Sequence, residues 1–532
     1  MKKKGLNSTI KGMTNLFLGL SLFVSNTVGI NASYSNTDKT KEEKVKEIEV
    51  IEIEEEVNEV EEVVEKREEY SSTYLNSDGT YTTYFYASPI RYQDEKGNLT
   101  DIDTSLETLD SKTKKKMSTD YDFKSKSTEV DILLPKEINE ETPVVLSWDK
   151  YTVKLVPITQ ESATRKSSAE TSNDLESASK SKAKLNKEVV RDIYGKVEEK
   201  DTSLIFDAFS DKKVNGDKNA IEIEYVPEVD GIKENIIINQ DVGVYRFDFY
   251  LELEGYLPKL TDYGAILLLD DKSKKEIGVI PVPLAYDSSS DYGVDYDVVH
   301  YELSELEEGY LLTVIVDKEY LEDEDRVYPV IIDPTISLKN TTVVETHINS
   351  KNPTVNYYGS GNNVMPVGYG TPQYISRTYM QFPSLNGVID DKVIISAKFY
   401  AKVNAADSKT KPRLERITGT WKASTLKWNN KPGIDYDSDS GTAAMSSGTK
   451  NWDITKTVQQ WASGEVANYG LCLRTTEESK SRLSYANFFG SRTGTAGNRP
   501  YLTVIYEDPS VIEEPIIVGR SNSRLECVLL HP

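Results

Sequence analysis

The chain has 532 residues, with 63 Lys and Arg against 87 Asp and Glu, and a formal net charge of −24 at pH 7. This length predicts roughly three to four structural units. The acidic balance argues against nucleic acid as a partner, because neutralising phosphates requires a basic surface. Two cysteines cannot form a disulfide framework, and three histidines leave little room for histidine-based or metal-dependent catalysis.

The first residues have the layout of a secretory signal peptide. A basic start at residues 2–4 precedes an apolar run at residues 16–24, and small residues then lead to a cleavage site before Ser33. The run is too short for a comfortable membrane span. We therefore predict a signal peptide over residues 1–32 and a secreted, extracellular protein. The cell wall is one candidate location, and no integral membrane span is expected after cleavage.

Composition then divides the rest of the chain into charged segments and β-rich segments. Runs of Glu or of Ser, Lys and Glu predict solvated linkers, whereas apolar and polar residues that alternate predict half-buried strands. It stays open whether the two β-rich regions before residue 338 form one domain or two. The predicted segments are an acidic spacer (33–73), a β-rich region (74–158), a linker (159–202), a second β-rich region (203–337), a C-terminal β module (338–507) and a tail (508–532).

Strict alternation marks the individual strands. Residues 221–226 and 395–403 alternate between apolar and polar side chains, so each predicts a strand with one buried face. Residues 454–461 follow a helical period instead, with Gly464 placed to end the helix. Many short strands separated by turn residues predict an all-β protein, with a jelly-roll or β-sandwich module at the C-terminal end.

A search for reactive residues finds no catalytic motif, so we expect no enzyme activity, no catalytic residues and no cofactor. The acidic run at residues 435–441 has carboxylates at alternate positions, as calcium prefers, but Ser440 and Ser446 stand where an EF-hand needs Gly and a bidentate acid. A solvated loop is the favoured interpretation and a looser calcium site the alternative. We therefore assign no metal ligands.

Aromatic residues raise the question of sugar binding, because their faces stack on the C–H faces of sugars. Trp428, Trp452 and Trp461 stand in contexts that favour core packing. Rings in Gly- and Asn-rich loops are better candidates for exposed contacts. The predicted ligand-binding residues are Tyr357, Tyr358, Tyr369, Tyr374 and Trp421.

The C-terminal block resembles the DNRLRE domain, also described as carbohydrate-binding module family 96. Six stretches occur in the family's order, and residues 421–432 are the most specific of them. The resemblance implies a non-catalytic carbohydrate-binding β-sandwich. Residues that match the family's structural motif are Trp428, Asn429, Asn430, Pro432, Trp452, Asp453, Trp461, Gly470, Arg499, Pro500 and Tyr501.

The region before this block is similar to the N-terminal part of secreted Rhs/YD-repeat wall-associated proteins, on residues 81–106 and 328–335. That resemblance implies a bacterial surface protein. No Tyr-Asp repeat follows residue 507, so we expect either a truncated or frame-shifted member or a natural short form.

Three functions follow as expectations. The first is a secreted, non-enzymatic protein whose module binds cell-wall or other extracellular polysaccharide. The second is a structural spacer that only displays or shields a partner region. The third is an enzyme that acts on polysaccharide and carries a binding module. Because the chain is acidic, binding to anionic wall polymers should need divalent cations, and a neutral glycan is the other option.

Overall fold

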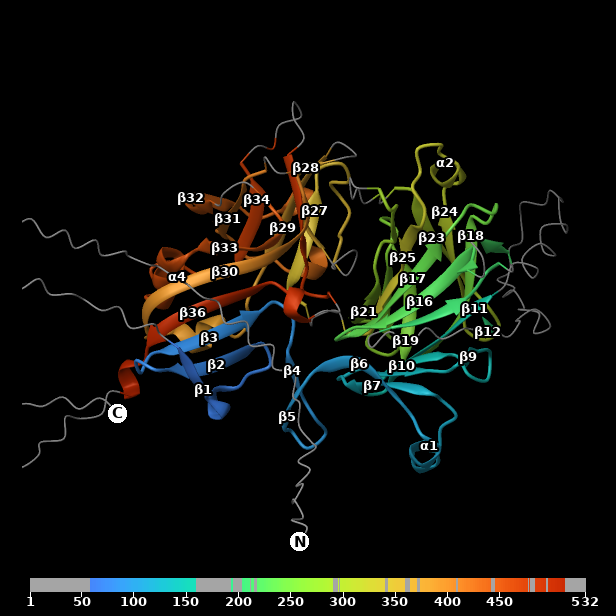
Figure 1. The fold of residues 1–532 in the computed structure, drawn as a ribbon, viewed down its shortest axis with the longest axis horizontal. Coiled ribbons are helices and arrows are strands. Elements are labelled where there is room, and N and C mark those ends of the chain that lie inside the picture. Colours follow the sequence, from blue (N-terminus) through green and yellow to red (C-terminus); the bar gives the residue numbers. More distant parts are fainter. Residues whose placement is uncertain are drawn as a thin grey trace, which may run out of the picture. The chain divides into compact units, whose positions relative to one another are not determined.

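The computed structural model describes residues 58–158, 193–194, 203–210, 212–214, 218–289, 295, 297–339, 343–358, 364–370, 374–407, 410–441, 445–476, 478, 484–493 and 496–511. The signal peptide, most of both predicted linkers and most of the tail lie outside these residues. Residues 57–532 form one compact unit. Strands dominate this unit and pair antiparallel (Figure 1). The prediction of an all-β protein is therefore confirmed.

The C-terminal module is built on a 13-stranded sheet. Along its main path the strands are β1 (Glu59–Glu62), β2 (Ser71–Asn76), β3 (Tyr81–Tyr86), β36 (Tyr501–Glu507), β30 (Val393–Ala406), β35 (Ser484–Phe489), β28 (Val364–Gly370), β29 (Tyr374–Met380), β34 (Leu471–Thr475), β31 (Pro412–Ile417) and β32 (Ile434–Gly441). Two further strands, β27 (Glu345–Asn349) and β33 (Gly448–Asp453), pair with β29 and β30.

Strand β30 lets this sheet enclose a core. Its first half pairs with β36, and its last residues pair with β35 after a bulge. Side chains of β30, β36, β34 and β35 meet in one apolar cluster, which includes Phe399, Leu502, Leu473 and Phe488. Bulges bend strands in this way and allow one sheet to form both layers of a sandwich.

Two further sheets share a second core. The eight-stranded sheet has the order β23 (Val299–Glu305), β24 (Tyr310–Val316), β18 (Arg246–Glu254), β11 (Tyr151–Ile158), β10 (Val144–Trp148), β8 (Asp131–Leu134), β7 (Phe123–Ser127) and β6 (Asp103–Thr108). The nine-stranded sheet contains β13 (Leu204–Asp207), β16 (Ile221–Pro227), β17 (Gly231–Ile238), β26 (Thr335–Ser337), β21 (Glu276–Ile280), β20 (Ile266–Asp270), β19 (Tyr256–Leu260), β22 (Leu284–Tyr286) and β25 (Val330–Asp333).

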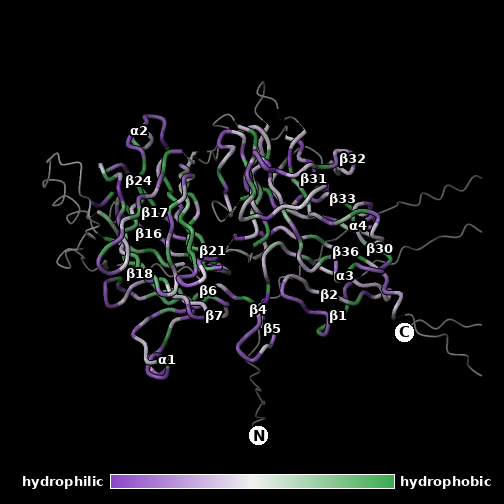
Figure 2. The backbone as a smooth tube through the Cα atoms, turned by 180° about the vertical axis from the view of Figure 1, so that it is seen from behind, coloured by the Kyte–Doolittle hydropathy of each residue, from purple (hydrophilic) through white to green (hydrophobic). Residues whose placement is uncertain are grey.

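The apolar cluster between these sheets draws on both β-rich regions, since Val153 and Ile223 belong to it together. Its strands β16, β17 and β18 carry many hydrophobic residues (Figure 2). The open question of one domain or two is thereby answered, because the residues on both sides of the predicted linker build a single core.

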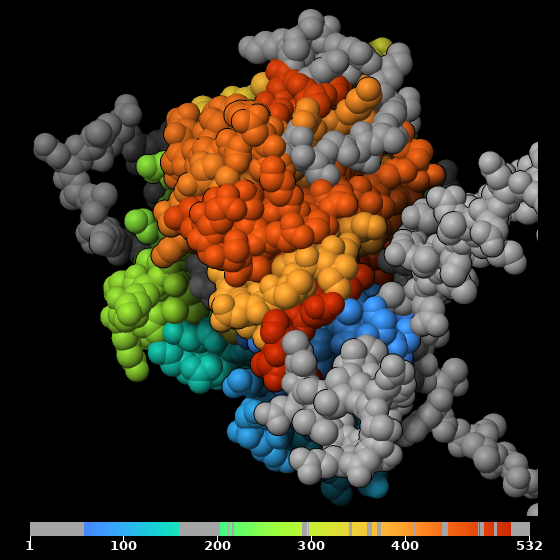
Figure 3. All heavy atoms as spheres, turned by 90° about the vertical axis from the view of Figure 1, so that its left-hand side faces the viewer, coloured from blue at the N-terminus to red at the C-terminus, as the bar shows by residue number. Residues whose placement is uncertain are grey.

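Strand pairing also corrects the predicted boundary at residue 74. Strands β2 and β3 join the C-terminal sheet through the β3–β36 ladder, whereas β6 to β11 join the eight-stranded sheet. Figure 3 shows residues near the N-terminal end of the described chain, in blue, directly beside the C-terminal module in orange and red. The end of the predicted acidic spacer is also strand. Local composition cannot reveal such partners, because these ladders join residues more than 400 positions apart.

The remaining elements are small. Three two-stranded ladders pair β4 (Arg91–Gln93) with β5 (Leu99–Asp101), β9 (Glu137–Ile138) with β12 (Ile193–Tyr194), and β14 (Lys213–Val214) with β15 (Lys218–Asn219). The α-helices are α1 (Ser111–Met117), α2 (Lys318–Leu321), α3 (Leu385–Ile389) and α4 (Thr455–Ala462). Among the described residues, none of these helices has the length and apolar character that crossing a membrane requires.

Helix α4 follows the predicted pattern. Ile454, Val458 and Trp461 are buried and face the module core. The Asp453 carboxylate accepts hydrogen bonds from the Thr455 backbone and hydroxyl, at 2.9 and 2.7 Å. Gly464 adopts φ of 71°, a left-handed conformation that glycine tolerates at a helix end.

Candidate functional site

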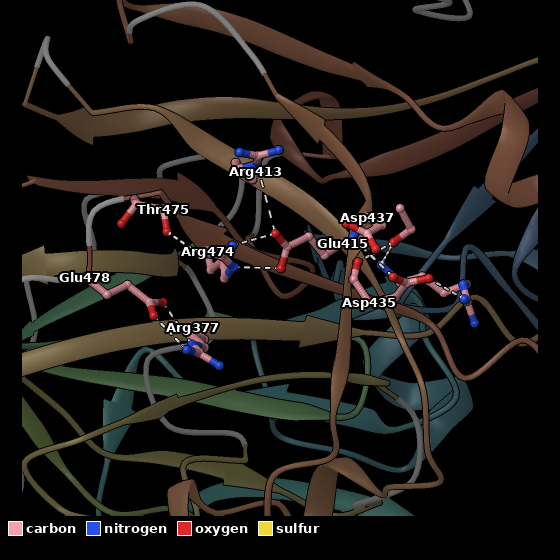
Figure 4. Close-up of polar contacts among 10 residues, drawn as sticks. Arg377, Arg413, Glu415, Asp435, Asp437, Arg474, Thr475 and Glu478 are labelled. Carbon is pink, nitrogen blue, oxygen red and sulfur yellow. Dashed lines mark hydrogen bonds and ion pairs between the residues drawn. The ribbon is translucent and has the colours of Figure 1, made fainter.

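Three arginines form a row across adjacent strands of the C-terminal module. Arg413 on β31 is paired in register with Arg474 on β34. Thr378 on β29 is paired with Leu473, so the preceding residue, Arg377, extends the same row. Alternate side chains of a strand share a face, and the three guanidinium groups therefore gather on the sheet face opposite the core (Figure 4).

Carboxylates hold this row in place. Glu478 accepts two hydrogen bonds from Arg377, at 2.8 and 2.6 Å. Glu415 accepts two from Arg474, both at 2.6 Å, and lies 4.0 Å from the Nε atom of Arg413 (Figure 4). Burial disfavours the charged form of Arg377, but the hydrogen bonds to Glu478 raise its pKa above the usual value. Such bidentate pairs are rigid and planar.

The acidic run at residues 435–441 forms strand β32 at the edge of this row. The Asp435 carboxylate accepts a hydrogen bond from Arg416 and another from the Asp437 backbone. The Ser438 hydroxyl donates to the Asp435 carbonyl at 2.7 Å. These bonds occupy the Asp435 carboxylate and carbonyl oxygens. Among the described residues, no group of His, Cys, Asp and Glu is arranged to hold a metal ion.

Two aromatic rings flank the arginine row. Tyr436 is 55% exposed, and the guanidinium carbon of Arg474 lies 4.7 Å from its ring centre. Trp428 is half-buried, with Arg377 at 5.4 Å and the Lys431 ammonium at 4.3 Å from its ring. Cations over aromatic faces stabilise both groups. We call this surface the arginine–tyrosine face; its members are Arg377, Arg413, Glu415, Trp428, Lys431, Tyr436, Arg474 and Glu478.

The predicted ligand-binding rings lie elsewhere. Tyr357, Tyr358 and Tyr369 are at most 3% exposed, so the expectation of exposed rings is wrong for these three. Tyr374 and Trp421 are half-buried. The Trp421 indole donates a hydrogen bond to the Tyr469 carbonyl at 2.8 Å.

Tyr357 is covered within its own module, where its ring stacks on His347 with ring centres 4.8 Å apart, whereas Tyr358 is buried by contact with the second core. Tyr358 and Ala423 share an apolar cluster with Ala265 and Val279 of the nine-stranded sheet. The Lys427 ammonium lies 4.8 Å from the ring of Tyr263. The ring of Tyr358 therefore packs against another part of the chain and offers no open face to a ligand.

The residues of the predicted structural motif serve the module's interior and turns. Trp452 and Trp461 lie in the core. The Asn430 side chain accepts from the Lys427 backbone at 2.6 Å, and the Asn429 backbone donates to the Pro353 carbonyl at 3.1 Å. Gly470 has φ of 90°, and a Cβ atom there would lie 2.2 Å from the Met380 carbonyl oxygen.

Most of the remaining motif residues lie near the C-terminal end of the module. Arg499 is 9% exposed and donates to the Thr493 carbonyl at 3.1 Å. Pro500 is buried, whereas Pro432 is half-buried. The Tyr501 ring stacks on Tyr400 with ring centres 4.9 Å apart.

Reasoning from the sequence missed the arginine–tyrosine face almost entirely. A usable signal was present in residues 412–417, where Arg413, Glu415 and Arg416 interrupt an apolar strand in an otherwise acidic chain. Charged residues of both signs on one strand indicate that one face of the strand carries ion pairs and does not belong to the apolar core. Their partners Arg377, Arg474 and Glu478 lie far away in the sequence and become neighbours only through the ladder.

The comparisons with known proteins identify the family of the C-terminal module. Residues 337–506 match the family model described as carbohydrate-binding module family 96, and every member of the arginine–tyrosine face lies within the match. The family that the sequence analysis named for this block is thus confirmed.

Curated relatives match a wider part of the chain. Two of them are the tRNA nuclease WapA of Bacillus subtilis, 31% identical over 336 residues, and the tRNA3(Ser)-specific nuclease WapA of Bacillus spizizenii, 30% identical. Each match covers 58% of this chain but only 14% of the relative. The chain thus corresponds to a small part of these much longer proteins.

Proposed function

We propose that this protein binds polysaccharide outside the cell through the arginine–tyrosine face of its C-terminal module. The observation that carries the proposal is the combination of an exposed Tyr436 ring with the bidentate Arg377–Glu478 pair and the half-buried Trp428 beside it. A sugar offers a C–H face and a rim of hydroxyl groups, which match an aromatic ring and fixed planar donors and acceptors. The match to a carbohydrate-binding family supports the same conclusion.

The arginines of the module are already paired with carboxylates, and this pairing favours a ligand with hydroxyl groups over a charged ligand. Arg377, Arg416 and Arg474 each already contact a carboxylate. Planar charged groups held in this way can donate to and accept from hydroxyls without a net charge on the ligand. We therefore infer a neutral glycan as the preferred ligand, in agreement with the expectation from the acidic composition. Binding should then depend weakly on salt.

Retention of the full chain on a panel of insoluble wall fractions and polysaccharides tests this function. Tyr436→Ala should weaken binding by up to about tenfold, because an aromatic contact contributes about 0.5–1.5 kcal/mol. Val393→Ala is a matched control, since Val393 is also an exposed hydrophobic residue (51%) of the module but lies outside the arginine–tyrosine face. Equal retention of both variants would place the ligand elsewhere.

The alternatives make different predictions in the same assay. A spacer or display module would be retained on no polysaccharide fraction, and an enzyme would release soluble sugar from the fraction that retains it. The names of the relatives add a nuclease as a further alternative. We expect tRNA to stay intact when incubated with the full chain, and its cleavage would contradict a non-catalytic role.

Export from the cell and association with the cell wall are also part of the proposal. Detection of the chain in culture medium or in wall extract tests them.

A further inference from the structure

Helix α1 carries an exposed cluster of lysines that contributes nothing to the core. It joins β6 to β7, and none of its seven residues is buried. Figure 2 shows that the helix is hydrophilic along its length, and Figure 1 places it at the end of the β6–β7 hairpin, away from the sheets. Helices in proteins gain most of their stability by burying an apolar face. Helix α1 has no such face, so its sequence is not explained by packing.

Spacing places three of its lysines on one face. Lys112, Lys115 and Lys116 stand at positions i, i+3 and i+4, where side chains of a helix are neighbours about 5–6 Å apart at Cβ. All three are exposed. Like charges at this spacing destabilise a helix. The favourable effect of cations near a helix C-terminus offsets part of this cost for Lys115 and Lys116 only.

Nearby carboxylates do not neutralise these lysines. Asp122 lies 2.7 Å from Lys114 and 4.0 Å from Lys136, and the Asp110 side chain accepts a hydrogen bond from the Thr113 backbone. Within the described part of the chain, no ion pair reaches Lys112, Lys115 or Lys116. A row of unneutralised ammonium groups in a chain of net charge −24 is therefore a local positive site.

We propose that Lys112, Lys115 and Lys116 bind a flexible polymer that carries phosphate groups along its backbone. Ammonium groups attract phosphate as point charges without demanding a fixed geometry. One face of a two-turn helix suits a thin, flexible chain. A nucleic acid duplex is wide and stiff and would need a broader basic surface than one face of a short helix provides. This site is separate from the arginine–tyrosine face and does not depend on its function.

Anisotropy of labelled long-chain inorganic polyphosphate, measured with the full chain at low and high salt, tests the proposal. The triple variant Lys112→Gln/Lys115→Gln/Lys116→Gln should bind at least about tenfold more weakly at low salt, with a salt slope that is smaller by about 2. Glutamine keeps a high helix propensity, so the helix itself should persist.

The matched control removes three lysines from the exposed turn between β20 and β21, Lys272→Gln/Lys274→Gln/Lys275→Gln. This variant has the same net charge as the first and should bind polyphosphate like the parent chain. Equal binding by both variants would overturn the proposal, and so would a parent chain that binds no polyphosphate at low salt. Tighter binding of a short RNA duplex than of polyphosphate would overturn the choice of a flexible polymer.

Discussion

Glu415 is the residue on which the geometry of the arginine–tyrosine face depends most. Its side chain is fully buried, accepts two hydrogen bonds from Arg474 and lies beside Arg413. Removing one partner of a buried ion pair leaves the other charge without compensation, which costs more than the pair itself contributes. The Glu415 carboxylate thus fixes the guanidinium groups of Arg413 and Arg474, and its removal should lower the stability of the folded protein.

We predict that Glu415→Gln lowers the free energy of unfolding by about 3 kcal/mol, because the Arg474 guanidinium stays buried with no opposite charge. Denaturant unfolding followed by tryptophan fluorescence measures this change. Asp437→Asn is the control, since that side chain is exposed and should change stability by less than about 0.5 kcal/mol. A loss below about 1 kcal/mol for Glu415→Gln would show that the pair does not hold this face.

At the scale of elements, strand β3 is the link between the start of the described chain and its end. It pairs with β2 on one side and with β36 on the other, so it is a central strand of the module's sheet. Thr83 in its middle is fully buried, and its hydroxyl lies 2.8 Å from that of Thr73. The C-terminal module is therefore complete only with strands that precede the matched segment by more than 250 residues.

We predict that Thr83→Pro destabilises the C-terminal module by about 3 kcal/mol or more, because proline removes a ladder hydrogen bond inside the sheet. Four of the five tryptophans belong to this module, so their fluorescence should report the change although the substitution lies far away in the sequence. Glu61→Pro in the edge strand β1 is the control and should be tolerated better. An unchanged unfolding midpoint for Thr83→Pro would contradict the β3–β36 ladder.

At the scale of the whole molecule, buried acids make stability depend on pH. Burial raises the pKa of Glu345 to about 7 and those of Glu228 and Glu234 to about 8. Between pH 4.5 and these values the unfolded chain is ionised while the folded chain keeps its protons, so stability falls as pH rises. Burial lowers the pKa of His347 to about 3, so stability also falls below about pH 6.5.

We therefore predict maximal stability near pH 4.5, because between pH 4.5 and 6.5 the three acids outweigh the single histidine, and a melting temperature that declines from there toward pH 8. Glu345→Gln imitates the protonated acid and keeps an acceptor for Ser491, whose backbone and hydroxyl donate to Glu345. This variant should raise the melting temperature at pH 8 by about 2–4 °C for each kcal/mol of stability gained. It should leave the melting temperature unchanged near pH 5. The exposed Glu507→Gln is the control. A flat profile for the parent chain would contradict the prediction.

Much of the fold was predictable from local patterns. The helical period of residues 454–461 correctly predicted which side chains enter the core, because the repeat of a helix decides its faces before any partner is known. The alternation of residues 395–403 was correct for Ala397, Phe399 and Ala401 but wrong for Ile395, which is 47% exposed because a bulge after Ile394 shifts the faces. The block that resembles a carbohydrate-binding module was also recognisable from motif residues such as Trp452, which fills the core.

The candidate site itself was decided only by the tertiary structure. Arg377, Arg413 and Arg474 form one row because two ladders set the register of three strands, and register depends on partners that no local pattern identifies. Tyr358 is buried because residues of the other core pack against it, and Tyr357 because its ring stacks on His347 of a neighbouring strand. The sequence by itself determined strands, faces and the family of the module, whereas contacts between distant segments determined which of its polar and aromatic side chains meet solvent.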